Sequence, residues 1–394
     1  MLLLVLGAAV VEGSAALVLG VLVRLRPTRF AVPVERFATQ VADVDAARLQ
    51  QRAAEDTYDA LLGWRNAPNG THDAVNSAGA RWSAHFDAAG ARRDPTARGD
   101  PLVAAFGDSF TECDEVNDDE TWEHDLATIS GVGVLNFGVG AYGPDQAILL
   151  AERTLAADRR APIVVLGIHE ENINRALNRY RPYYLPLDPM TLTFKPRFVL
   201  GERGLELLPN PLAIEGSAPA PITAYLAEAA RGDYWFAYNA QRPRVAAPFS
   251  YQLAKLALDV AVEKAILAVN PLAPLRNDPW RDPAAQDLMT ALVRRFASHV
   301  RASGATPVLL LIPEVGDAAR WQDHVPGYHP WLDRLRAAVP SSELAIVDVA
   351  GAITDPVHFR VRPDGGHASA DGNRTIAAAL WPVLQPLLDH GDAR

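Results

Sequence analysis

Two short polar segments contain the residue types of a nucleophilic catalyst. The first is Gly107-Asp108-Ser109-Phe110, which follows a short apolar run. Such a run, bounded by glycine, predicts a buried strand, and we expect a helix over residues 115–127. Ser109 would then lie on a sharp turn at a helix N-terminus, whose free N–H groups favour developing negative charge. The alternative is an ordinary loop in which the aspartate or serine only caps the helix, and this stretch alone leaves both interpretations open.

The second segment is Asp364-Gly-Gly-His367, close to the end of the chain. A histidine can take the proton of a serine hydroxyl and return it to a leaving group, while an aspartate holds the imidazole tautomer. The alternative is a polar loop with an aspartate cap. His358 is the other candidate base, but it lies before this last loop.

Two further polar segments follow apolar runs. Residues 136–143 are rich in glycine, which lets the backbone approach a ligand and direct N–H groups toward it. Residues 167–172 end in Asn172, whose amide could donate to an oxyanion. His169 and the two glutamates after it do not match His-Glu-x-x-His, and no second histidine lies nearby, so we predict no metal site and no cofactor.

The composition is that of a globular chain with a sizeable core. Of 394 residues, 49% are hydrophobic and 21% charged. The net charge of −10 argues against nucleic acid as a partner. The single cysteine, Cys113, excludes an intrachain disulfide and a zinc cluster.

From residue 101 onward, apolar runs alternate with helical patterns. This alternation predicts an α/β fold: a three-layer, flavodoxin-like parallel sheet with helices on both faces, whose ligands bind beyond the carboxyl ends of the strands. Helices are expected, among others, over residues 146–157 and 285–302. The expected strands are residues 101–106, 133–137, 162–168, 306–312 and 344–347.

A long stretch, about residues 174–283, interrupts the alternation and is predicted to be an insertion. It contains a hairpin pattern around residues 194–208 and a helical pattern over residues 251–269. Its cluster of arginine and tyrosine at residues 179–184 could line a groove for a sugar or an anionic substrate. The alternative is that these arginines only brace the hairpin.

The chain begins with an apolar segment, residues 2–23, interrupted by Glu12 and Ser14. Its length approaches the ~20 residues that cross a hydrocarbon core. The absence of a basic region before it favours a transmembrane anchor over a cleaved signal peptide. The arginines after it would place the bulk of the chain in the cytoplasm by the positive-inside rule. Glu12 is costly in the middle of a span unless it is paired or neutral.

We therefore predict three parts. Residues 1–30 form the anchor, and residues 31–100 form a linker with a lead-in of short strands. Within the linker, residues 32–56 are predicted to be a polar, alanine-rich helix or linker. Residues 101–388 form the main domain with the insertion at about 174–283.

Taken together, the four polar segments resemble the blocks of the SGNH (GDSL-like) hydrolase superfamily: Gly-Asp-Ser, a glycine in a strand-to-helix turn, Gly-x-Asn-Asp, and Asp-x-x-His. The order and wide spacing match over residues 101–388. The lead-in and the segment Tyr142-Gly-Pro-Asp-Gln146 are similar to the membrane-associated bacterial branch of this superfamily.

The resemblance implies Ser109 as nucleophile, His367 as general base and Asp364 as its orienting partner. The oxyanion hole would use the N–H groups of Ser109 and of the Gly140–Ala141 turn together with the side chain of Asn172. Two blocks depart from the superfamily pattern, because the oxyanion glycine falls on Ala141 and Asn172 lies in Glu-Asn-Ile. Cys113 stands where glycine is usual, and we interpret it as a packed thiol.

This resemblance implies a membrane-anchored esterase that acts through an acyl-serine on an acylated glycan or lipid, with its catalytic domain outside the cytoplasm. One alternative is an O-acyltransferase that modifies a cell-surface or exported polysaccharide. Another is a weakly catalytic or non-catalytic envelope scaffold or glycan-binding protein, which the two altered blocks favour.

Overall fold

The structure is a computed structural model. It describes residues 1–33, 35–37, 57–96, 100–157, 161–185, 194–211, 222–270, 273, 275, 278–315, 321, 325–363 and 365–391. Most of the polar helix or linker predicted for residues 32–56 therefore lies outside the described residues.

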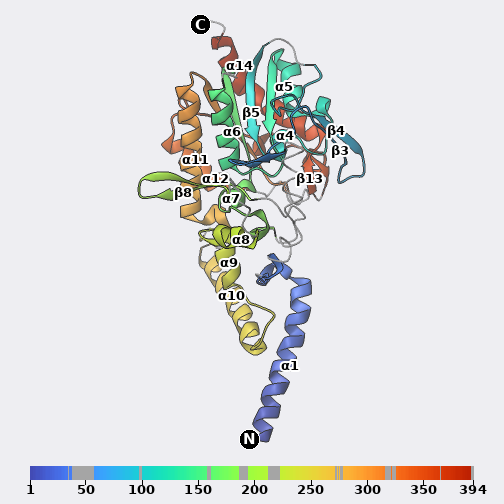
Figure 1. Cartoon of the computed structure of the whole chain (residues 1–394), viewed down its shortest axis with the longest axis vertical. Coiled ribbons are helices and arrows are strands. Elements are labelled where there is room, and N and C mark those ends of the chain that lie inside the picture. The colour runs from blue at the N-terminus through green and yellow to red at the C-terminus, as the bar shows by residue number, and fades with distance from the viewer. Residues whose placement is uncertain are drawn as a thin grey trace.

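One five-stranded parallel sheet forms the centre of the molecule (Figure 1). Its spatial order is β11-β10-β7-β5-β6, so the chain reverses direction across the sheet between β5 and β7. This is the order of flavodoxin-like folds, in which ligands bind at the carboxyl ends of the strands beside the reversal. The predicted fold class is confirmed, and all five expected strands are present. They are β5 (Pro101–Gly107), β6 (Gly133–Gly138), β7 (Ile163–His169), β10 (Thr306–Ile312) and β11 (Ala345–Asp348).

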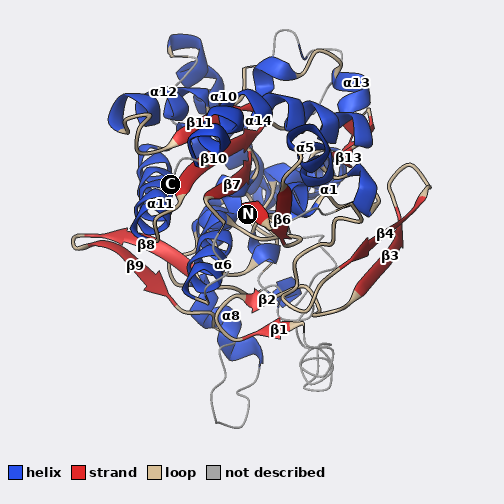
Figure 2. Ribbon diagram, turned by 90° about the horizontal axis from the view of Figure 1, so that it is seen from above, coloured by secondary structure: helices blue, strands red, loops and turns tan. Residues whose placement is uncertain are grey.

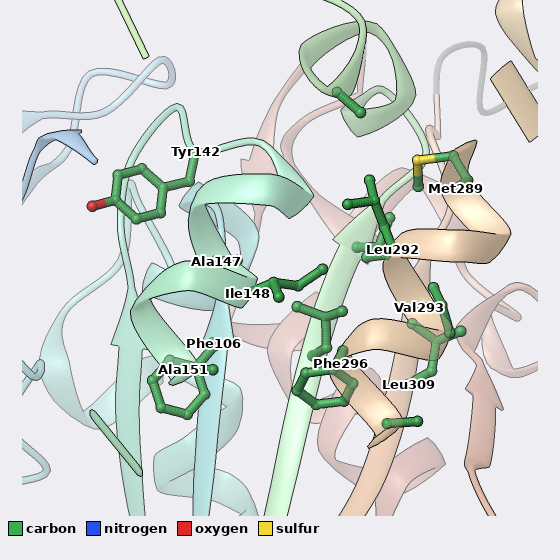
Figure 3. Close-up of a cluster of buried hydrophobic side chains, with 14 of the residues drawn as sticks. Phe106, Tyr142, Ala147, Ile148, Ala151, Met289, Leu292, Val293, Phe296 and Leu309 are labelled. Carbon is green, nitrogen blue, oxygen red and sulfur yellow. The ribbon is translucent and has the colours of Figure 1, made fainter. Parts of the chain in front are cut away.

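The strands are apolar on both sides because helices cover both faces of the sheet. In β5, Ala104 and Phe106 point into one hydrophobic cluster, and Val103 and Ala105 into the other. The first cluster lies under α6 (Pro144–Ala156), α11 (Pro283–Ala302) and α12 (His329–Ala338). Figure 3 shows Phe106 and Ile148 of this cluster with residues of α11. The second cluster lies under α5 (Trp122–Ser130) and α14 (Ala370–Gly391).

The helix predicted over residues 115–127 was wrong in its first half. A single turn, α4 (Ser109–Glu112), follows β5, and α5 begins only at Trp122. The intervening backbone cannot be helical, because Cys113 and Glu115 have left-handed φ values of 63° and 73°. The acidic run instead forms a short 3₁₀ turn, and the Thr121 side chain caps α5.

The lead-in consists of two small hairpins, as the turn signals predicted. They are β1 (Tyr58–Asp59) with β2 (Gly63–Trp64), and β3 (Thr71–Val75) with β4 (Arg81–His85). The first is fixed to the turn after β6, because the Tyr142 hydroxyl donates to the Trp64 carbonyl over 2.6 Å. The second protrudes from the domain on the side away from the β8–β9 hairpin (Figure 2). The first hairpin thus lies beside the carboxyl end of β6.

The insertion contains α7 (Asn172–Ala176), the hairpin β8 (Arg197–Gly201) and β9 (Gly204–Leu208), and the helices α8 (Ile222–Ala230), α9 (Tyr234–Gln241) and α10 (Phe249–Val269). The arginine–tyrosine cluster braces it: Arg179 is buried and donates to the Glu228 side chain, and Tyr180 and Tyr183 pack with Phe194. The groove interpretation is therefore not supported for Arg179. Short elements complete the fold: α13 (Pro356–Phe359), β12 (Arg360–Arg362), β13 (Gly365–Ala368) and several 3₁₀ turns.

The N-terminal apolar segment forms a long helix, α1 (Leu2–Leu25), that extends away from the domain (Figure 1). Over residues Leu3–Leu25 its mean hydropathy is 2.1, and little of it is buried. By length and composition it could cross a membrane, a property that a signal sequence shares.

Candidate active site

Ser109 lies at the carboxyl end of β5, beside the point where the sheet order reverses. It is the first residue of α4, and the Asp108 carboxylate caps this turn by accepting from the Phe110 N–H at 2.9 Å. The glycines around it permit close packing rather than unusual backbone angles. A Cβ on Gly107 would lie 2.0 Å from the Thr111 hydroxyl, and one on Gly138 would lie 2.0 Å from the Glu112 nitrogen. These two glycines therefore let α4 sit directly on the strand ends.

The structure brings His367 to Ser109 from the opposite end of the domain sequence. His367 lies on β13, and its Nε2 is 2.9 Å from the Ser109 Oγ. Gly366, the residue before it, has a φ of +88°, and a Cβ there would lie 2.8 Å from a Glu115 carboxylate oxygen. The Gly-Gly pair in this segment thus allows the histidine backbone to approach a carboxylate.

That carboxylate belongs to Glu115. Its Oε2 accepts from the His367 backbone N–H at 2.6 Å and lies 3.1 Å from Nδ1. Its Oε1 accepts from the Ser77 N–H at 2.6 Å, so the β3–β4 turn also holds it. Asp364, predicted to orient the histidine, lies outside the described residues, and its role stays a prediction. Sequence reasoning missed Glu115, since it lies six residues after the serine in a run interpreted as helix.

The pKa values follow from this pairing. Burial opposes the charge on Glu115, but hydrogen bonds from His367 and Ser77 outweigh it and lower the pKa of Glu115 to about 2. Burial also opposes protonation of His367, but the Glu115 hydrogen bond and the charge of Asp114 raise the pKa of His367 above its ordinary value. Glu115 is therefore an anion at neutral pH and favours a proton on the imidazole.

A second carboxylate lies on the other side of the imidazole. The Asp114 Oδ2 is 3.9 Å from His367 Nε2, and its side chain is partly exposed. Burial raises the pKa of Asp114, although the nearby His367 acts in the opposite direction. A partly negative group at this position disfavours an anionic substrate beside Ser109.

The four predicted oxyanion-hole residues gather near the same strand ends, but two of their donors are engaged. The Asn172 amide donates to the Asp108 Oδ2 at 2.7 Å. The Gly140 N–H donates to the buried Glu112, whose pKa is raised well above its ordinary value by burial and by Asp114. Ala141 has a φ of +67°, which an alanine adopts at a cost of ~1 kcal/mol. That conformation explains why glycine suits this position better.

A possible cation site was tested on the side chains behind Asp108. Potential ligand atoms of Asp108, His169 and Glu171 lie within 4.8 Å of one another. The buried Arg175 guanidinium already pairs with two of these side chains, 3.3 Å from Asp108 and 2.5 Å from Glu171. Burial and the neighbouring arginine hold the pKa of His169 well below its ordinary value. The arginine supplies the positive charge that a metal would, so the cluster is better explained as an internal ion pair.

Arg92 organises the loop that carries Glu115, a role that no sequence pattern indicated. It is buried, and its guanidinium donates to the Asp118 carboxylate at 2.9 Å. It also donates to the carbonyl groups of Glu112, Cys113 and Val116 at 2.6–2.7 Å. The Arg92 side chain thus donates to backbone carbonyl groups on both sides of Glu115 and holds this left-handed segment in place.

The remaining sequence candidates lie apart from this chemistry. His358 is mostly exposed and pairs with Asp355 at 2.6 Å, with no contact to Ser109 among the described residues. Cys113 is buried, and burial raises the pKa of its thiol well above the ordinary value. It is a packed thiol that lies 3.3 Å from Glu123.

No protein-family model and no curated protein sequence matches this chain. Several solved structures are similar to it. One is a protein of Desulfitobacterium hafniense described as lipolytic and of the G-D-S-L family, at 11% identity and a TM-score of 0.34, covering 72% of this chain and 98% of its own. TesA has 13% identity and a TM-score of 0.33, with the same two coverages. An acetyl-xylooligosaccharide esterase from Geobacillus has 12% identity and a TM-score of 0.35, covering 73% and 94%.

At TM-scores of 0.33 to 0.35, these similarities carry no statement about function or substrates. The chain's own topology places a serine after the first sheet strand and a histidine before the last helix, and the two side chains meet at the reversal of the strand order. The chain therefore has a flavodoxin-like α/β fold in which a serine and a histidine meet at the carboxyl ends of the strands.

Proposed function

We propose that this protein is a serine-dependent acyl-ester hydrolase that works through an acyl-serine intermediate. The observation that carries the proposal is the chain of contacts from Ser109 Oγ to His367 Nε2 at 2.9 Å and from His367 Nδ1 to Glu115 at 3.1 Å. A hydroxyl, an imidazole and a carboxylate in this order form the arrangement that activates a serine.

In the proposed reaction, His367 removes the hydroxyl proton as Ser109 attacks the ester carbonyl. The same proton then passes from Nε2 to the leaving alkoxide, and the acyl group stays on Ser109. In the second half, His367 takes a proton from water, the hydroxide attacks the acyl-serine, and the proton returns to Ser109. Glu115 stabilises the imidazolium that forms twice in this cycle, which its anionic state at neutral pH supports.

The oxyanion would be stabilised first by the Ser109 N–H of the first turn of α4, for which the described residues show no acceptor. The Asn172 amide could join it by exchanging its hydrogen bond with Asp108 for one with the oxyanion. Each well-placed donor typically contributes about 10²–10³ to the rate.

We further propose an acylated glycan or lipid as the substrate. Asp114 beside the serine supports a neutral ester over an anionic one. In Figure 1, α7 and β13 lie at the edge of the domain from which α1 and α10 extend, which supports an active site that faces a membrane surface. The same acyl-serine could pass its acyl group to a sugar hydroxyl instead of water, which would make the protein an O-acyltransferase.

A non-catalytic scaffold or glycan-binding role is the second candidate. The engaged donors of Asn172 and Gly140 favour it, because a hole whose donors are bound to carboxyl groups stabilises an oxyanion poorly.

One experiment separates these candidates. The purified protein and its Ser109→Ala variant are treated with a fluorophosphonate probe and assayed with a short p-nitrophenyl ester. We expect labelling and hydrolysis that the variant loses, with its melting temperature unchanged. Equal hydrolysis by both proteins, or absence of labelling in the parent, would refute the proposal. With an acylated glycan present, the masses of the products distinguish hydrolysis from transfer.

A further inference from the structure

The contact between α1 and α10 explains the acidic residue in the apolar helix. The Glu12 carboxylate accepts from the N–H groups of Phe249 and Ser250, at 2.6 and 3.1 Å, and from the Ser250 hydroxyl. These donors form the first turn of α10, where N–H groups lack partners within the helix. Glu12 is thereby paired at the middle of a segment in which an unpaired charge is costly.

A second set of contacts fixes the other end of the two helices. Arg29, just beyond α1, pairs with Glu263 of α10. The Asn239 side chain bonds both the N–H and the carbonyl of Val32 at 2.8 Å, and the Ala31 N–H donates to Pro243. Ser250 therefore lies at the level of Glu12, and Glu263 lies at the level of Arg29. The two helices consequently run in parallel. At ~1.5 Å per residue, the first part of α10 accompanies half of α1 over roughly 20 Å.

One face of α10 carries exposed apolar side chains, together with Lys255, which lies four residues after Tyr251. No described residue of this 21-residue helix is buried. A stripe of five exposed side chains runs along it, at the spacing of one helix face. Its members are Tyr251, Leu258, Val262, Ile266 and Val269, which are 60%, 63%, 46%, 39% and 88% exposed.

Most of the charged side chains of α10 are paired. Lys255 pairs with Asp259 at 2.8 Å, and Glu263 pairs with Arg29. A helix with an exposed apolar stripe, whose neighbouring charges are paired, suits a medium of low polarity.

We propose that α10 is a second membrane element, inserted beside α1. Its N-terminal half lies in the hydrocarbon layer, with Tyr251 and Leu258 of the stripe against lipid acyl chains and its first turn bound to Glu12. The inference rests on the proposed membrane location of α1. Lipid is the occupant because Tyr251 and Leu258 lie between the levels of Glu12 and Arg29, as do the exposed apolar side chains Leu17, Val18 and Val21 of α1. The length of α1 also matches a bilayer. Figure 1 shows both helices extending from the same side of the domain.

The test uses single cysteines in the full chain, because the only native cysteine, Cys113, is buried. Leu258→Cys probes the stripe, and Leu17→Cys probes α1, where Leu17 is 72% exposed. Val75→Cys is the matched control, since Val75 on the catalytic domain is 63% exposed, the same as Leu258. Each variant carries a polarity-sensitive fluorophore and is reconstituted into phosphatidylcholine vesicles with or without a nitroxide on the acyl chains.

We expect blue-shifted emission at positions 17 and 258, with at least a twofold loss of fluorescence in nitroxide vesicles, and neither change at position 75. Quenching at position 17, with neither a blue shift nor quenching at position 258, would overturn the inference and leave α1 alone as the anchor. Quenching at neither would overturn both the anchor and the inference, without bearing on ester hydrolysis. A blue shift at 258 without nitroxide quenching would mean that protein, not lipid, covers the stripe, and would also overturn it.

Discussion

Glu115→Gln is the change that best tests the proposed chemistry, because it removes the charge and keeps the shape. The carboxylate oxygen is 3.1 Å from His367 Nδ1. With an effective dielectric constant of about 20, a pair of unit charges at this separation attracts by about 5 kcal/mol. Because the imidazole is partly exposed to water, the attraction it experiences is weaker than this value. We therefore expect Glu115→Gln to lose ~3–5 kcal/mol of transition-state stabilisation. At ~1.4 kcal/mol per factor of ten, kcat falls by roughly 10²–10⁴.

The pH profile distinguishes this role from a structural one. His367 must be neutral to act as base, so kcat/KM of the parent rises with pH through the pKa of His367, which lies above its ordinary value. Glu115 is a main cause of that raised pKa, so in Glu115→Gln the midpoint moves to lower pH even as the plateau falls. The assay is p-nitrophenyl acetate hydrolysis between pH 5 and 9.

Asp364→Asn is the matched comparison, because the sequence assigns Asp364 the same role. Because Glu115 already lies at Nδ1, we expect a smaller loss of activity from Asp364→Asn than from Glu115→Gln. The reasoning is refuted if Glu115→Gln keeps parental activity and midpoint while Asp364→Asn loses a hundredfold or more.

Two further predictions concern the residues that hold Glu115 in place. Gly366→Ala should lower kcat/KM at least tenfold, because its Cβ would lie 2.6 Å from the Ser77 hydroxyl and 2.8 Å from Glu115 at a φ of +88°. Gly79→Ala is its control, with the same backbone strain at φ +89° and nothing within 4 Å of the Cβ, and equal activity of the two variants would contradict the clash. Arg92→Lys should lower the free energy of unfolding by about 2–4 kcal/mol in urea titrations and reduce kcat/KM, because one ammonium cannot reach all the carbonyls that the guanidinium satisfies. An Arg92→Lys variant whose free energy of unfolding in urea lies within about 0.5 kcal/mol of the parent's would contradict this prediction.

The sequence predicted the parts of the fold that depend on local pattern. Strands buried between two layers of helices must be apolar on both faces, so all five sheet strands stand out as short apolar runs. α6, α10 and α11 are long enough for their periodicity to be unambiguous. The turn between β5 and α5 could not be predicted from local pattern, because its acidic residues suit a helix. Only the packing of Arg92 and the left-handed backbone of Cys113 and Glu115 exclude a helix there.

The chain by itself therefore determined the sheet, the apolar N-terminal helix and the two segments that supply Ser109 and His367, because residue types and periodicity are local properties. The tertiary structure decided which side chains meet. It set His367 against Ser109 across 258 residues of chain, chose Glu115 as the described carboxylate on the imidazole, and engaged Asn172 with Asp108. It also paired Glu12 with α10. Each of these contacts joins elements distant in sequence, and only the packing of the sheet, its loops and the insertion sets their distances.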